Sequence, residues 1–332
     1  MVKTLQYWEI HMKKNFVKTM APFIGLSALA MVSAHTNAGV MATSYLNVSA
    51  LLLEIDVNND GIADQVNPLD YVSITGGQRT TQTNATLQGA NTASGVALAG
   101  TLGTSDAAFS CLGDCSGVSE NGNTYDLDTL KNDITSTYAV SDALIEGSAL
   151  GGGATGQTYA DTAMSGASTT GGGTAGSIIT NNVFADLLIQ VNKDLLGEDT
   201  ISFRFVAIYD LFVDAIISED IADDPLLTGL ASASASFSLD VNDESGAEVL
   251  SAGIEETDFA RDQPGRGNQN IFEVDNGAFV TDWLEVNDGE YQLEILQSSS
   301  AQVNYVPAPA SLALFGLGLV GLGAAARRKR TA

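Results

Sequence analysis

One short stretch of the chain carries a regular spacing of oxygen-bearing side chains. Asp56, Asn58, Asp60 and Asp64 stand at positions 1, 3, 5 and 9 of a loop, and Ile62 supplies a main-chain carbonyl at position 7. Oxygen ligands at alternate positions, with a glycine at position 6, are what a tight loop needs to wrap a hard cation. The pattern predicts a calcium site at these five residues.

Two interpretations of the loop stay open. It resembles the calcium loops of EF-hand, dockerin and thrombospondin-type proteins, which implies a weak site of the extracellular kind. It departs from them at position 12, where Asn67 replaces the bidentate acid and Asp70 follows. Asn, Asp and Gly are equally the residues of an ordinary turn between strands, and residues 51–55 before the loop read as a strand.

Few residues are suited to catalysis. The only histidines, His11 and His35, lie within the first 38 residues, which removes Ser-His-Asp and Cys-His catalysis and histidine-ligated metals from the body. A carboxylate pair, as in glycoside hydrolases, is the catalytic alternative. With 39 acidic residues between 39 and 306, pairs arise by chance and no spacing singles one out. We expect a protein that is not an enzyme.

The amino-terminal segment has the pattern of a secretory signal peptide. Lys13, Lys14 and Lys18 precede an apolar run over residues 20–32, and small residues follow up to Ala34 and Ala38. We predict a signal peptide over residues 1–38, with cleavage after Ala34 or Ala38 and Met12 as an alternative start. This predicts engagement of the secretion machinery.

The carboxyl-terminal segment has three parts in a fixed order. An apolar stretch over residues 312–326 would span about 22 Å as a helix, short for a bilayer core of about 30 Å. A basic cluster after it would stay on the cytoplasmic side. The short motif before the stretch is Val306, Pro307, Ala308 and Pro309, and the basic cluster is Arg327, Arg328, Lys329 and Arg330.

This tail, residues 306–332, resembles the PEP-CTERM sorting signal, although Ala308 stands where the usual motif has Glu. The resemblance implies processing by an exosortase-type enzyme, transient anchoring in the inner membrane and delivery to the cell surface or extracellular matrix of a Gram-negative-type bacterium. It also implies association with exopolysaccharide and biofilm. In such an oxidising exterior, Cys111 and Cys115 are predicted to close a small disulfide loop.

The body between the two signals is strongly acidic. It holds 39 acidic residues and six basic ones, a formal charge of −33. Such a surface repels phosphate backbones and attracts cations, which excludes nucleic acid as a partner.

The body also divides by composition. Residues 39–179 are expected to form a Gly-, Ala-, Ser- and Thr-rich β/loop region, which begins with a strand and turns and continues over residues 73–180 as short irregular strands and long loops. Residues 180–305 are expected to form the core, because segments 201–208 and 233–241 alternate as half-buried strands do. Asp288 and Gly289 predict a hairpin between residues 283–286 and 291–295. Core candidates are Phe203, Phe205, Phe237, Leu239, Trp283, Tyr291 and Leu293.

Short strands with frequent turns predict a mostly β fold, an antiparallel, jelly-roll-like β-sandwich with a helix at each end of the chain. The sequence thus predicts a secreted, non-catalytic surface or matrix protein. The alternative is a carbohydrate-binding or adhesive module, with Trp283, Tyr291 and Tyr305 as candidate sugar-binding aromatics.

Overall fold

The computed structural model describes residues 39–75, 77–99, 104–116, 136–147, 155–165, 171–182, 186–189, 200–218, 227–261 and 269–307. Nearly all of these residues form antiparallel strands, and one short 3-10 helix, η1 (Pro68–Asp70), lies among them. The mostly β, antiparallel prediction is confirmed. The predicted signal helix and the apolar segment 312–326 lie outside the described residues. Within the described part of the chain, no helix is long and apolar enough to span a bilayer.

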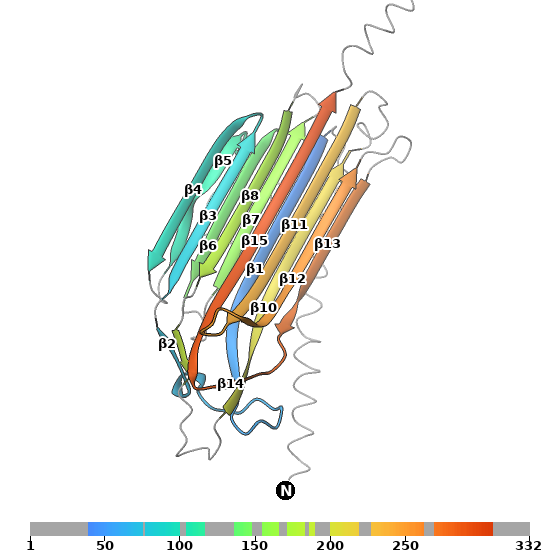
Figure 1. Ribbon diagram of the computed structural model, residues 1–332. Coiled ribbons are helices and arrows are strands. Elements are labelled where there is room, and N and C mark those ends of the chain that lie inside the picture. The colour runs from blue at the N-terminus through green and yellow to red at the C-terminus, as the bar shows by residue number, and fades with distance from the viewer. Residues whose placement is uncertain are drawn as a thin grey trace, which may run out of the picture.

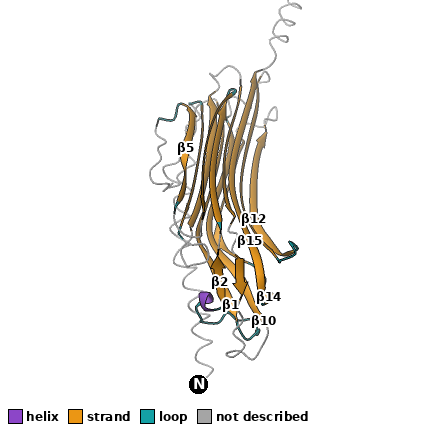
Figure 2. Ribbon diagram, turned by 60° about the vertical axis from the view of Figure 1, so that its left-hand side comes forward, coloured by secondary structure: helices purple, strands orange, loops and turns teal. Residues whose placement is uncertain are grey.

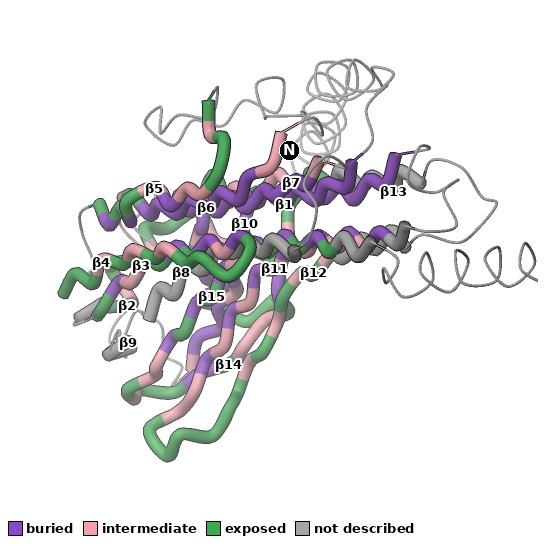
Figure 3. The backbone as a smooth tube through the Cα atoms, turned by 90° about the horizontal axis from the view of Figure 1, so that it is seen from above, coloured by how far each residue is buried: buried purple, intermediate pink, exposed green. Residues whose placement is uncertain are grey.

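Two sheets lie face to face, as the side view and the view from above show (Figures 2 and 3). The first sheet has seven strands, with β14 paired beside β10. In spatial order its strands are β13 (Gln269–Val280), β10 (Thr200–Ile217), β1 (Gly39–Asp56), β7 (Thr155–Ser165), β6 (Tyr138–Glu146) and β5 (Ser105–Gly113), followed by β14 (Leu284–Asn287).

The second sheet has eight strands, and long β15 runs through its centre (Figure 1). A short pair, β2 and β9, extends it at one end, where β9 pairs with β15. In spatial order the strands are β12 (Glu248–Arg261), β11 (Leu227–Asn242), β15 (Gly289–Pro307), β8 (Gly171–Asn182), β3 (Gln78–Leu87) and β4 (Ala90–Ala99), followed by β2 (Val72–Thr75) and β9 (Asp186–Ile189).

The apolar core lies between the two sheets on the side of β1, β10 and β11. Alternate residues of these strands point inward, as the period of two requires. Phe203 and Phe205 of β10 meet edge to face at 5.5 Å between ring centroids, and Phe237 of β11 meets Phe279 of β13 at 6.0 Å. The predicted core residues Phe203, Phe205, Phe237, Leu239 and Leu293 are buried, whereas Trp283 and Tyr291 are half-buried.

Hydroxyl pairs join the sheets on the side of β3, β5 and β7. The hydroxyls of Thr81 and Ser105 lie 3.1 Å apart, and Thr83 and Ser110 lie 2.8 Å apart. Each of these polar atoms is buried but hydrogen-bonded, so its burial costs little. The described parts of residues 73–180 therefore form regular strands, where the sequence predicted short irregular ones.

The predicted hairpin around Asp288 and Gly289 is wrong. β14 pairs with β10 in the first sheet, with Leu284 opposite Phe203, whereas β15 begins at Gly289 in the second sheet opposite Ile189 of β9. The Asn-Asp-Gly segment is a corner where the chain changes sheets. Both sheets also take strands from either side of residue 180.

Candidate functional site

The Asp56–Asp64 loop follows β1 directly and is shaped by its own side chains. Both carboxylate oxygens of Asp56 accept main-chain hydrogen bonds, from Asp60 N at 3.2 Å and from Gly61 N at 2.6 Å. Asn58 Oδ1 also accepts from Asp60 N at 3.1 Å, and Asp60 Oδ1 accepts from Ile62 N at 2.9 Å. Asp56 is buried, and Ile62 is exposed.

The loop is closed at its base by Asp64. Its amide donates to the carbonyl of Ile55 at 2.8 Å, and its Oδ2 accepts from Val57 N at 2.8 Å. Asn59 and Gly61 lie in the left-handed region, with φ of 53° and 81°, which Asn and Gly adopt at least cost. The Asn-Asn-Asp-Gly sequence is therefore suited to this tight turn.

The loop keeps both interpretations that the sequence left open. Its carboxylates serve as acceptors for loop amides, which is what an Asx-rich turn does. Among the described residues, no three acidic, cysteine or histidine side chains gather as a metal-binding group. Calcium binding at Asp56, Asn58, Asp60, Ile62 and Asp64 thus stays a prediction.

Asn59 joins the loop to the first sheet. Its Nδ2 donates to Thr200 Oγ1 at 3.3 Å, and its Oδ1 accepts from Ser202 Oγ at 2.7 Å. Thr200 in turn donates to Glu285 of β14 at 2.9 Å. These hydrogen bonds hold the loop against β10 and β14.

Cys111 and Cys115 are disulfide-bonded at the end of β5, with Cα atoms 6.4 Å apart. Gly113 between them has a φ of 86°, and a Cβ there would clash with the carbonyl oxygen of Thr137. Both cysteines pack against an apolar cluster on the outer face of the first sheet that includes Tyr138. This packed environment is typical of a disulfide that stabilises the fold.

The first two residues of the sorting motif belong to the last strand. Val306 and Pro307 end β15, opposite Thr228 and Leu227 of β11. The remaining sorting residues, Ala308, Pro309, Arg327, Arg328, Lys329 and Arg330, lie outside the described residues.

Two of the three candidate sugar-binding aromatics have partners within the protein. Arg204 Cζ lies 4.4 Å above the ring of Trp283, and Arg204 is paired with Glu54 at 2.6 Å between Nη2 and Oε2. Tyr291 packs against the apolar core. The structure describes the strand position of Tyr305 but not its side chain.

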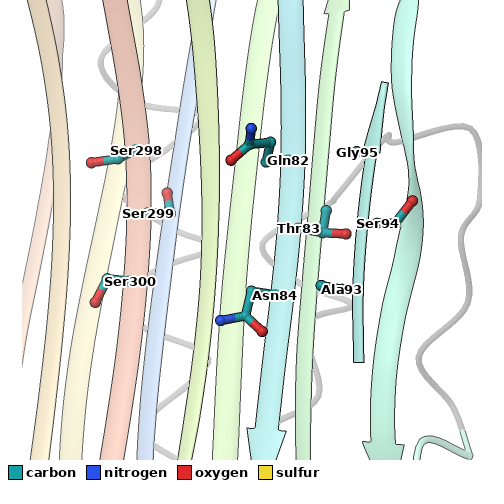
Figure 4. Close-up of a pocket in the computed structure, with 9 residues that line it drawn as sticks. All are labelled: Gln82, Thr83, Asn84, Ala93, Ser94, Gly95, Ser298, Ser299 and Ser300. Atoms are coloured by element: carbon teal, nitrogen blue, oxygen red, sulfur yellow. The ribbon is translucent and has the colours of Figure 1, made fainter. Parts of the chain in front are cut away.

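A shallow polar groove, which the sequence did not single out, crosses the outer face of the second sheet (Figure 4). β8 lies between the lining residues of β3 and those of β15, and its Gly176 is paired with both Asn84 and Ser300. The lining residues are Gln82, Thr83, Asn84, Ala93, Ser94, Gly95, Ser298, Ser299 and Ser300.

None of the described residues that line this groove has an ionisable side chain, although the body is strongly acidic. Gln82 and Asn84 line it from β3, and Ser298 and Ser300 line it from β15, where the Ser298 hydroxyl lies 2.7 Å from the Ser236 hydroxyl of β11. Amides both donate and accept hydrogen bonds, as hydroxyls do. The signal in the sequence was polar alternation along β3 and β15, which marks an outward face but does not say that two such faces share a groove.

The tail identifies one functional property of the chain. The family profile of the PEP-CTERM protein-sorting motif matches residues 306–330. The chain thus carries a PEP-CTERM sorting motif, which implies processing by an exosortase and sorting to the cell envelope or extracellular space.

Comparison with whole proteins adds little. No curated protein matches the chain. A solved structure, the enzymatically active domain of tailspike protein 4 of bacteriophage CBA120, is 18% identical over 42% of this chain and 19% of its own length, with a TM-score of 0.09. At that score the similarity carries no argument about fold or function.

Proposed function

We propose that the mature protein is a non-catalytic component of the cell surface or of the extracellular polysaccharide matrix. The observation that carries this proposal is the continuity of the sorting motif with β15, the central strand of the second sheet. The β-rich body is then the cargo that the sorting signal delivers. The confinement of both histidines to residues 11 and 35 supports a role other than catalysis.

In this proposal the two ends of the chain act in succession. The segment over residues 1–38 directs the chain through the secretion machinery, and the apolar stretch 312–326 holds it transiently in the inner membrane of a Gram-negative-type cell. The exosortase-type enzyme then releases the body at the motif that begins with Val306. The acidic surface keeps the released body soluble and supports its association with cations.

Fractionation of cells that express the full chain tests this function. The wild-type body should appear in the surface or matrix fraction, whereas a Pro307→Ala/Pro309→Ala variant should remain with the inner membrane. Gln302→Ala, an exposed change on the same strand, is the matched control. Export of the proline variant at the wild-type level would contradict the role of the motif, and release of reducing sugars from matrix polysaccharide would contradict a non-catalytic body.

The groove over β8 supports a second candidate, a carbohydrate-binding module for neutral exopolysaccharide. The uncharged amide and hydroxyl groups along the groove can donate hydrogen bonds to, and accept them from, the hydroxyls of a neutral sugar chain. Gln82→Ala/Asn84→Ala should reduce pull-down by native matrix polysaccharide, whereas Thr80→Ala/Thr86→Ala on the same strand, which do not line the groove, should not. Equal retention of both variants would rule out this groove as the binding site.

The loop after β1 supports a calcium-stabilised form of the same module. Thermal unfolding of the exported protein is measured in EDTA and then in millimolar calcium at constant ionic strength. A calcium-specific rise in Tm that disappears in Asp60→Ala but persists in Asp243→Ala, which alters the acidic turn after β11, would support the site. An equal effect of matched monovalent salt would show that the loop is an ordinary turn.

A further inference from the structure

The second sheet ends on one side in an edge strand without a charged residue. This strand, β4, pairs only with β3 among the described strands, and none of its ten residues is buried. The sequence holds no charged residue between Arg79 and Asp106, although the body as a whole carries a formal charge of −33. β4 lies at the outer margin of the sheet in both Figure 1 and Figure 3.

The other long edge strands all carry acids. β5 contains Asp106, β13 contains Glu273 and Asp275, and β12 contains four acidic residues beginning at Glu248. Charged side chains on an edge strand discourage pairing with another chain, because pairing would bring them together and desolvate them. β4 lacks this protection.

We propose that β4 is a docking edge for a second copy of this chain. Two β4 strands pair antiparallel, so that the second sheets of two molecules join into one continuous sheet. Two bodies of equal negative charge repel each other wherever acidic surfaces meet. They can therefore approach where both surfaces are uncharged, and β4 with the adjacent β3 provides such a surface.

The shape of β4 suits a symmetric contact. Antiparallel pairing of two identical strands has two-fold symmetry, as an isologous interface requires. The outward-facing residues near the middle of the strand are Ala93, Gly95 and Ala97, so β4 itself places no bulky side chain on its outer face there. A glycine within an edge strand also allows another backbone to approach closely.

β4 is ordered before any partner arrives. Ser105 Oγ of β5 donates to the carbonyl of Val96 at 3.3 Å, and Ala108 N of β5 donates to Ser94 Oγ at 3.1 Å. These contacts fix the strand against the first sheet, which lowers the ordering cost of association. Because pairing uses β4 on both molecules and leaves only acidic long edges, the assembly closes as a dimer.

Sedimentation velocity of the exported protein, from cells that express the full chain, tests the proposal between about 1 and 100 µM. We expect a concentration-dependent dimer for the wild type. Ala93→Lys/Ala97→Lys places lysines on the exposed face of β4 and should weaken self-association at least about tenfold. Val249→Lys/Ser251→Lys places the same charges on the exposed face of β12 and should leave it unchanged.

A second measurement does not depend on how the lysine variants fold. Single cysteines at Asn91, Ala93 and Ala97 should include one position that forms an intermolecular disulfide on mild oxidation, whereas Ser251→Cys on β12 should not. A wild-type protein that stays monomeric over the whole concentration range would overturn the proposal, whatever else β4 binds. Loss of the dimer in the β12 variant, or cross-linking through β12, would also overturn it.

Discussion

Gln297 shows how a single polar side chain joins the two sheets. It lies in β15 with 3% of its surface exposed, and its Nε2 donates to the carbonyls of Leu46 in β1 and Gly156 in β7 at 2.8 and 3.1 Å. Gln297→Leu keeps the size but removes the donor for both buried carbonyls, so it should destabilise the fold by about 1–3 kcal/mol. Urea unfolding should show a lower midpoint, and Gln302→Leu, exposed on the same strand, should not. Equal midpoints would contradict this role.

We expect the ionisation of Tyr209 to lower the stability of the folded protein at alkaline pH. Burial raises its pKa to about 12, and the hydrogen bond to Asp275 Oδ2 at 2.7 Å, together with that negative charge, adds to the shift. Above pH 10 the unfolded chain releases this proton while the folded protein keeps it. Stability should therefore fall as the pH rises from 10 to about 12, by an amount on the order of 2 kcal/mol.

Tyr209→Phe tests this linkage through the slope rather than the absolute stability, because the variant also loses the hydrogen bond to Asp275. Thermal unfolding between pH 9 and about 12 should show a shallower fall in Tm for the variant. A pH titration followed by absorbance at 295 nm should show one fewer tyrosine with a raised pKa in the variant than in the wild type. An unchanged slope would mean that Tyr209 ionises alike in the folded and unfolded states.

At the scale of elements, the sequence predicted strands better than it predicted their partners. The alternation of residues 233–241 is found in β11, and the turn after it is stabilised by Asp243, which accepts from Ser245 and Ala247 amides at 2.8 and 3.0 Å. Asp288 and Gly289 gave an equally good turn signal, but there the flanking strands belong to different sheets. A local turn motif fixes a change of direction and does not decide which strand becomes the neighbour.

The pairing of β11 with β12 requires a glycine at one position. A Cβ at Gly253 would lie 2.6 Å from the carbonyl oxygen of Phe237, whereas one at Gly95 in β4 would meet its nearest atom, Thr81 O, at 3.4 Å. Gly253→Ala should therefore destabilise the protein by about 1–3 kcal/mol, and Gly95→Ala should have little effect. Thermal unfolding of the two variants provides the comparison. A larger loss in Gly95→Ala would contradict this account of the edge strands.

For the whole molecule, the acidic charge and the carboxyl-terminal sorting motif were readable from composition and position, but the extent of the core was not. Because large apolar residues are few in the Gly-, Ser- and Thr-rich half, the sequence predicted long loops there. The structure instead packs small residues between the sheets and bonds their hydroxyls in pairs, such as Thr158 with Ser299 at 2.7 Å. Such pairs join residues far apart in the chain, so no local pattern reveals them. The groove over β8 was missed for the same reason.

The direct connection of the body to its sorting motif predicts that folding and processing are coupled. Val306 lies opposite Thr228 in the β11–β15 ladder, so the enzyme that cleaves near this motif needs the end of β15 released from β11. A cysteine pair, Thr228→Cys/Val306→Cys, should lock the strand end and make the precursor accumulate in the inner membrane. A reductant should restore processing. The matched pair Asp240→Cys/Glu294→Cys, far along the same ladder, should be processed normally. Pulse-chase labelling measures the precursor, and normal processing of the locked strand end would show that cleavage proceeds with β15 fully paired.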